Sequence, residues 1–158
     1  MKHLGTKRLE TERLVLRRFT VADAEPMYRN WASDGEVTKF LTWPAHTSVE
    51  MSEMVLRDWT GHYAEESYYQ WAIVPKSTRE PIGSISVVSR NDRAELVHIG
   101  YCIGRSWWHR GIMSEALRAV MRKCGMKYEG TLRQSDRNNQ GICDASWYGL
   151  LREERIAR

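Results

Sequence analysis

The sequence predicts an α+β domain in which a mixed, mostly antiparallel sheet is flanked by helices. Three strand-like runs follow one another between residues 68 and 103, separated by turns that contain Pro, Asn or Asp. Segments with helical spacing of apolar residues lie before and after this block. Consecutive strands with helices at either end are typical of the α+β class.

The length of 158 residues predicts one domain, covering residues 1–158, with a substantial core. Hydrophobic residues make up 42% and charged residues 28% of the chain, which is close to globular averages. The N-terminus lacks the apolar core of a secretion signal, and no apolar run approaches the roughly 18 residues that span a bilayer. We therefore expect a cytoplasmic protein without a membrane segment.

The first elements are read from apolar spacing and capping residues. Residues 14–19 alternate apolar and basic side chains as a half-buried strand does. Thr20 is a suitable N-cap for a helix over residues 21–31, in which Pro26 indicates a kink or a later start. Residues 48–61 are predicted to form a second helix, because apolar side chains recur at helical intervals.

The strand-like runs cover residues 68–74, 81–89 and 94–103 and are predicted to form an antiparallel meander. A helix follows with its apolar stripe on Leu117, Val120, Met121 and Cys124, and Gly125 is expected to end it. Residues 127–132 and 145–151 are the expected closing strands, joined by a polar segment.

Charge and cysteine content bound the function classes. The net charge of +4 is small and its basic residues are scattered, so it favours an acidic ligand only weakly. The aromatic and glycine signature of an RNA-binding module is missing, so nucleic acid is not the expected partner. Cys102, Cys124 and Cys143 lack the paired Cys/His spacing of a zinc site, and we expect no metal and buried thiols.

The segment "GRSWWHRGIMSEALRAV", residues 104–120, indicates an anion site. It carries the chain from a strand through a glycine-bearing turn into a helix. The first turn of a helix presents backbone N–H groups without intrahelical acceptors at its positive end. A phosphate approaches such a backbone only where no side chain blocks it, which is what Gly111 offers.

Four segments in order carry a family resemblance: "TERLVLRRFTVADAEPMY", "HIGYCIG", "WWHRGIMSEALRAV" and "MRKCGMKYEGTLRQ". Together they resemble the GNAT superfamily N-acetyltransferases, specifically the RimJ/RimL-like branch (the ribosomal-protein-alanine acetyltransferase type) that acetylates protein N-termini and other amines. The resemblance covers nearly the whole chain. It implies the GNAT fold and direct transfer of acetyl from acetyl-CoA to a primary amine.

The resemblance also implies which residues bind acetyl-CoA. The diphosphate would lie on a turn made of Trp108, His109, Arg110, Gly111, Ile112 and Met113, with Ser114 following at the helix start. The strand before it would hold the thioester and the pantetheine arm through the backbone, at Ile99, Tyr101, Cys102 and Ile103. Trp108 and Met113 depart from the family pattern, which has a polar and a small residue there. The alternative is an ordinary glycine turn with Trp107 and Trp108 as core or interface aromatics.

Two residues are candidate bases. Many family members carry a glutamate at the position that matches His98, two residues before the Gly-Tyr pair, and Glu95 is the second candidate. An imidazole suits proton removal at neutral pH. The alternative reading of His98 is a structural histidine with its hydrogen bonds satisfied.

The junction between Val120 and Met121 departs most from the family, because roughly thirty residues that would carry a fifth strand are missing there. Three explanations stay open: a genuine deletion, an engineered or damaged chain, or an omitted segment. The apolar stripe stays in phase through the junction and allows one continuous helix. The difficulty of building a cofactor cleft without that strand favours an omitted segment, which would separate the two Cα atoms by far more than ~3.8 Å.

The acceptor is not written in the sequence. A protein N-terminal amine is the first expectation from the resemblance, with a small amine such as a polyamine or amino-sugar antibiotic behind it. A non-catalytic or impaired acyl-CoA-binding module on the same scaffold is the alternative function. Strand edges and tryptophan-rich surfaces leave a homodimer open.

Overall fold

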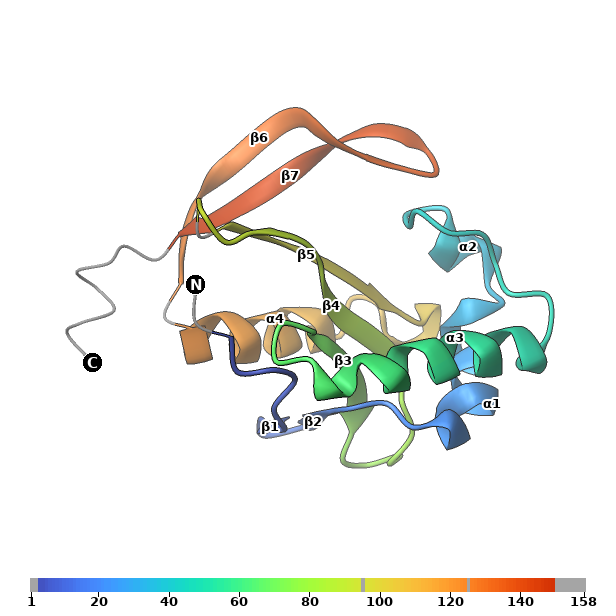
Figure 1. Cartoon of the computed structure of the whole chain (residues 1–158). Helices are drawn as coiled ribbons and strands as arrows, with labels where there is room; N and C mark the ends of the chain where they lie inside the picture. The colour runs from blue at the N-terminus through green and yellow to red at the C-terminus, as the bar shows by residue number, and fades with distance from the viewer. Residues whose placement is uncertain (1–2, 95, 125, 150–158) are drawn as a thin grey trace.

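The computed structural model describes residues 3–94, 96–124 and 126–149, and its centre is one antiparallel sheet (Figure 1). The five strands lie in the order of the chain, and each pairs antiparallel with the next. Their bounds are β1 Leu9–Glu10, β2 Leu14–Arg17, β3 Gln70–Pro75, β4 Gly83–Asn91 and β5 Leu96–Ile103. The predicted meander, β3 to β5, is therefore confirmed; the short β1 was not expected.

Helices cover both faces of this sheet (Figure 1). The long helices are α3, Val49–Gly61, and α4, Ile112–Cys124, and the short ones are α1, Ala24–Met27, and α2, Gly35–Thr38. Among the helices in the described parts of the chain, none has the length and apolarity needed to cross a membrane.

The predicted helix over residues 21–31 is broken into three kinds of turn. It begins as a 3₁₀ turn at Val21–Asp23, capped by Thr20, continues as α1 and ends in a π-helical turn at Tyr28–Ala32. Pro26 lies in the first turn of α1, where a missing N–H costs least. The later start that Pro26 indicates is confirmed, and the second predicted helix is α3 with Ser48 as its N-cap.

The period-2 alternation of β3 divides the core between the two faces of the sheet. Trp71 and Ile73 join one buried cluster with the α4 residues Ile112, Ala116 and Val120. Ala72 and Val74 face the other way and join a second buried cluster with residues of α1 and α3. The sheet is therefore held between α4 on one face and the N-terminal helices on the other.

The helix α4 crosses the Val120–Met121 junction without interruption. Val120 is buried and Leu117 packs against the same cluster, as the in-phase apolar stripe predicts. The chain is continuous at this junction. Which of the three explanations accounts for the missing residues stays a prediction. The predicted stop at Gly125 lies outside the described residues, and the burial predicted for Cys124 is not tested because its side chain is not described. Cys102 is buried as predicted, while Cys143 is only partly buried.

The closing strands form a hairpin of their own. β6, Lys127–Asn138, pairs antiparallel with β7, Gly141–Gly149, and in the described chain neither strand pairs with β5. The hairpin is longer than the sequence predicts, because the polar segment expected to join its strands itself extends β6; the prediction up to Leu151 runs past the described residues.

Two contacts fix the hairpin above β5, with its turn directed toward the segment that carries α2 (Figure 1). At the turn, Asn139 donates its backbone N–H to the carbonyl oxygen of Leu41 at 2.9 Å. Its Nδ2 donates to the carbonyl oxygens of Thr38 at 2.7 Å and Trp43 at 3.1 Å. Midway along β6, Asp136 pairs with His98 of β5.

Candidate active site

The connection between β5 and α4 is shaped by two glycines. A Cβ on Gly104 would collide with the carbonyl oxygen of Asn30, so this position admits no side chain where the chain leaves β5. Gly111 has a φ of 70°, in the left-handed region, and immediately precedes α4. Nothing lies closer to the Cβ position of Gly111 than Nη2 of Arg13, at 3.8 Å, so the backbone of this exposed turn is uncovered.

The turn combines uncovered backbone with positive charge. Ile112, Met113 and Ser114 form the first turn of α4, whose N–H groups have no acceptor within the helix. Arg110 is exposed, with its guanidinium 5.4 Å from the centroid of the Trp107 ring. Arg118 is also exposed, further along α4. Such a site favours an anion through backbone donors, helix polarity and nearby cations.

Trp108 and Met113, the two residues that depart from the family pattern, pack against the hydrophobic core. Trp108 packs against both buried clusters and donates its Nε1–H to the carbonyl oxygen of Ile103 at 2.9 Å. Its ring also meets Phe40 edge-on at 6.0 Å. Met113 packs partly buried against the α4-side cluster. The side chain of Trp108 is therefore a core aromatic, as the alternative reading expects. The backbone of the turn is nevertheless uncovered at Gly111.

The backbone of β5 presents alternate residues to its two edges. The N–H of Gly104 donates to Ile82, on the side of β4, at 2.9 Å. Because backbone groups alternate along a strand, Ile99, Tyr101 and Ile103 direct theirs away from β4. The carbonyl of Ile103 is taken by Trp108. The groups of Ile99 and Tyr101 thus face an edge that no other strand of the described chain covers.

Cys102 has a different environment from its neighbours on β5. It is buried and its Sγ lies 3.3 Å from Oγ of Ser84 on β4. Burial raises the pKa of the Cys102 thiol, and the hydrogen bond with Ser84 opposes this only in part. Cys102 is thus a core residue with a protonated thiol, and its side chain does not face the open edge.

His98 lies five residues before the end of β5, about 17 Å along the strand from Ile103. Its side chain is half-exposed, and its Nε2 lies 3.1 Å from Oδ2 of Asp136 on β6. The second candidate base, Glu95, lies outside the described residues. An imidazole with one nitrogen held by a carboxylate keeps the other nitrogen available to accept a proton.

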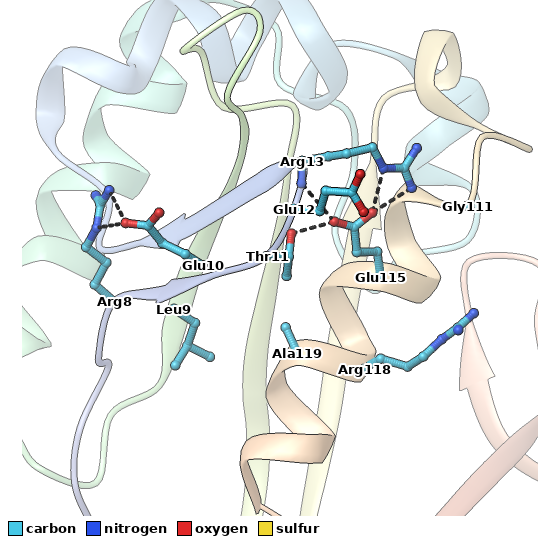
Figure 2. A pocket seen from close by; sticks show the side chains of 10 residues that line it. All are labelled: Arg8, Leu9, Glu10, Thr11, Glu12, Arg13, Gly111, Glu115, Arg118 and Ala119. Carbon is cyan, nitrogen blue, oxygen red and sulfur yellow. Dashed lines mark hydrogen bonds and ion pairs between the residues drawn. The ribbon is translucent and has the colours of Figure 1, made fainter.

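A pocket of about 830 Å³ lies beside the turn, between α4 and the connection from β1 to β2 (Figure 2). Gly111 is the one sequence-predicted site residue among its lining residues, and no residue of β5 lines it. Arg13 and Glu115 meet at its edge through an ion pair of 2.6 Å. Sequence analysis did not single out either residue, because they lie about a hundred positions apart and no local pattern joins them.

Comparisons with known proteins identify the family of this chain. Residues 13–141 match the family of the acetyltransferase (GNAT) domain. The chain is 26% identical to the uncharacterized N-acetyltransferase YoaA of Bacillus subtilis (strain 168) over 171 residues, which covers 91% of this chain and 96% of YoaA. That alignment is longer than this chain of 158 residues, so it includes positions that this chain lacks.

A second sequence relative and a solved structure also belong to N-acetyltransferases. The chain is 34% identical to the uncharacterized N-acetyltransferase p20 of Bacillus licheniformis over 116 residues, which covers 72% of this chain and 63% of p20. Its fold is similar to the structure of RimL, a ribosomal L7/L12 alpha-N-protein acetyltransferase in complex with coenzyme A. That similarity has a TM-score of 0.69 at 18% identity and covers 90% of this chain and 96% of the other.

The family model spans most of the chain and includes the β5 strand, the glycine turn and α4. The expected GNAT fold is confirmed, and the alternative of a non-catalytic module is not favoured. With this fold, this turn and these relatives, the chain belongs to the GNAT acetyltransferase family and is an acetyl-CoA-dependent N-acetyltransferase.

Proposed function

We propose that this enzyme acetylates the N-terminal amine of a protein, as a RimJ/RimL-like member of its family. The observation that carries the proposal is the pairing of an uncovered glycine turn with an open backbone edge on the strand that leads into it. The similarity of the fold to RimL supports the choice of acceptor. If the acceptor is a ribosomal protein, as for RimL, the enzyme acts in the cytoplasm, which is the location expected from the sequence.

Each part of the site has one task in this proposal. The backbone N–H groups from His109 to Ser114 bind the diphosphate of acetyl-CoA, since neither a side chain on Gly111 nor an intrahelical acceptor competes. The backbone of Ile99 and Tyr101 binds the pantetheine arm and donates to the thioester carbonyl oxygen, where negative charge develops during transfer. The side chains of Cys102 and Ile103 pack into the buried clusters on opposite faces of the sheet and hold this strand in place.

Acetyl transfer from a thioester requires a neutral amine, and His98 supplies the base. Its Nδ1 accepts the proton of the attacking amine, while Asp136 holds Nε2 and stabilises the cationic ring that results. No covalent enzyme intermediate is needed, because the amine nitrogen attacks the carbonyl carbon directly. As the carbon–nitrogen bond forms, the acetyl–sulfur bond breaks and coenzyme A leaves as a thiolate, which takes a proton from solvent. Cys102 takes no part, since its buried thiol stays protonated.

Two measurements test the proposal in order. Calorimetric titration with acetyl-CoA should show binding to the wild-type chain; absence of binding at saturating ligand would overturn the assignment of the turn. Intact-mass spectrometry should then show the gain of one acetyl group on a peptide with a free N-terminal amine. The same peptide with a blocked N-terminus and an internal Lys serves as control, and acetylation of it, or of a polyamine alone, would replace the proposed acceptor.

A further inference from the structure

The connection between β1 and β2 reaches α4 through a compact set of polar contacts (Figure 2). One carboxylate oxygen of Glu115 accepts from Oγ1 of Thr11 at 2.5 Å and from the backbone N–H of Arg13 at 3.2 Å. The other accepts from Nε of Arg13 at 2.6 Å and lies 2.6 Å from Nη2. We call Thr11, Arg13 and Glu115 the clamp.

The clamp touches the glycine turn directly. Nη1 of Arg13 donates to the carbonyl oxygen of Arg110 at 3.2 Å, and Nη2 is the atom nearest the Cβ position of Gly111. The peptide between Arg110 and Gly111 is planar and trans, so fixing its carbonyl toward Arg13 directs the N–H of Gly111 the opposite way. A turn with left-handed residues can flip its peptides at low cost unless such a contact holds them.

The contacts of the clamp favour the charged form of Glu115. Partial burial of Glu115 tends to raise the pKa of its carboxyl, but hydrogen bonds from Thr11 and Arg13 outweigh it and hold the pKa below its usual range. Glu115 is therefore an anion at neutral pH. It restrains the guanidinium of Arg13 by both Nε and Nη2 and leaves Nη1 for the turn.

We infer that the clamp is a positioning device for the acetyl-CoA diphosphate: it sets the orientation of the Gly111 N–H and places one guanidinium beside it. The inference rests on the proposed function of the turn. The clamp residues come from the connection between β1 and β2 and from the first turn of α4, so ligand affinity at the turn depends on an element at the far edge of the sheet from β5.

The same pocket provides a matched control. Arg8 donates to Oε1 of Glu10 from Nε at 3.1 Å and from Nη2 at 2.8 Å, which is also a two-pronged Arg–Glu pair lining the pocket. Neither residue contacts the glycine turn in the described contacts. Removing this pair tests whether the loss of any charge pair in the pocket has the same effect.

The experiment compares ligands with and without a diphosphate. Arg13→Ala, Arg13→Lys, Glu115→Gln, the Arg13→Ala/Glu115→Gln double variant and the Arg8→Ala control are titrated with coenzyme A and assayed with acetyl-CoA and S-acetylpantetheine. Because each lost contact involves a charged group, we expect the Kd for coenzyme A and the KM for acetyl-CoA to rise about tenfold in Arg13→Ala and Glu115→Gln. The kcat should change less than about twofold, since the clamp does not touch the reacting atoms.

With S-acetylpantetheine, which lacks the diphosphate, the clamp variants should match the wild type. The double variant should lose no more affinity than Arg13→Ala, because the two residues act through one contact. If circular dichroism shows that Arg13→Ala does not fold, Arg13→Lys and Glu115→Gln provide the same test. Arg13→Lys keeps the positive charge, and Glu115→Gln keeps the shape of the side chain.

The outcomes separate the two claims. If the wild type does not bind coenzyme A, the proposed function fails and the clamp with it. If the wild type binds and the clamp variants bind equally well, or if activity with S-acetylpantetheine falls in parallel, the clamp alone is overturned. An equal loss of affinity in Arg8→Ala would also overturn it.

Discussion

The imidazole Nε2 of His98 lies 3.1 Å from Oδ2 of Asp136, and this pair joins the last strand of the sheet to the separate hairpin. In the neutral ring the carboxylate selects the tautomer with the proton on Nε2, which leaves Nδ1 as an acceptor. The same contact therefore gives the hairpin a fixed place and gives the candidate base a fixed direction.

Replacement of His98 by Ala should lower kcat by about 10²-fold or more, within the range that general-base catalysis contributes. The loss should be largest near neutral pH and smaller at high pH, where the amine loses its proton without help. Steady-state kinetics from pH 6 to about 9.5 measure this profile. His62→Ala is the control, because His62 is a half-exposed histidine paired with Glu65 at 2.6 Å and remote from β5. An unchanged pH profile would return His98 to a structural role.

Replacement of Gly111 by Ala should weaken acetyl-CoA binding and destabilise the fold by about 1–2 kcal/mol, the cost of a left-handed residue with a side chain. The added methyl group would also hinder the diphosphate of acetyl-CoA from approaching the backbone of the turn. Calorimetric titration and thermal denaturation measure the two effects. Gly35→Ala is the control, since a Cβ there meets nothing within 4 Å and its φ is not in the left-handed region. Unaltered affinity in Gly111→Ala would count against diphosphate binding at this turn.

Replacement of Asn139 by Ala removes two side-chain hydrogen bonds, to Thr38 and Trp43, and keeps the backbone bond to Leu41. The expected loss of stability is about 1–2 kcal/mol, with faster hydrogen exchange confined to β6 and β7. Gln140→Ala, one residue further along the same turn, should leave both quantities unchanged. Exchange that rises across the whole sheet instead would show that the contact does not act on the hairpin alone.

The buried His46 makes stability depend on pH. Burial lowers the pKa of its imidazole in the folded state, and its Nδ1 shares a 2.7 Å hydrogen bond with Oγ of Ser52. The unfolded chain then binds a proton at His46 more readily than the folded chain does. The contribution of His46 to stability is therefore fully present above about pH 6.5 and is lost as the pH falls toward the lowered pKa of the folded state. Urea denaturation at several pH values measures this slope. His46→Asn should flatten it, and an equal slope in both proteins would assign the dependence to other groups.

The sheet and its long helices could be predicted because their sequence signals are local. The alternation in residues 68–103 and the helical spacing of apolar residues in 48–61 act over a few positions, and the structure keeps both. The β6–β7 hairpin was predicted too short for the same reason. Its polar residues resemble a loop by composition, yet pairing with β7 decides their conformation.

The site could be predicted only where it is continuous in the chain. The turn with Gly111 follows from a strand, a glycine and a helix in sequence, and the left-handed φ of Gly111 agrees with it. The clamp could not be found this way, because Arg13 and Glu115 meet only after folding has brought the connection between β1 and β2 against α4. The contact between His98 and Asp136 could not be predicted from the sequence either, because Asp136 lies on a strand whose position depends on the contacts of Asn139. The suggested homodimer and the role of Glu95 stay predictions.

The uncovered edge at Ile99 and Tyr101 has a further cost for the protein. Unsatisfied groups along a strand can template extended chains from other molecules, which is the first step of fibre growth. A pantetheine arm lying along that edge would take the place of a neighbouring strand. Coenzyme would then protect the purified enzyme from self-association during storage, in addition to feeding its reaction.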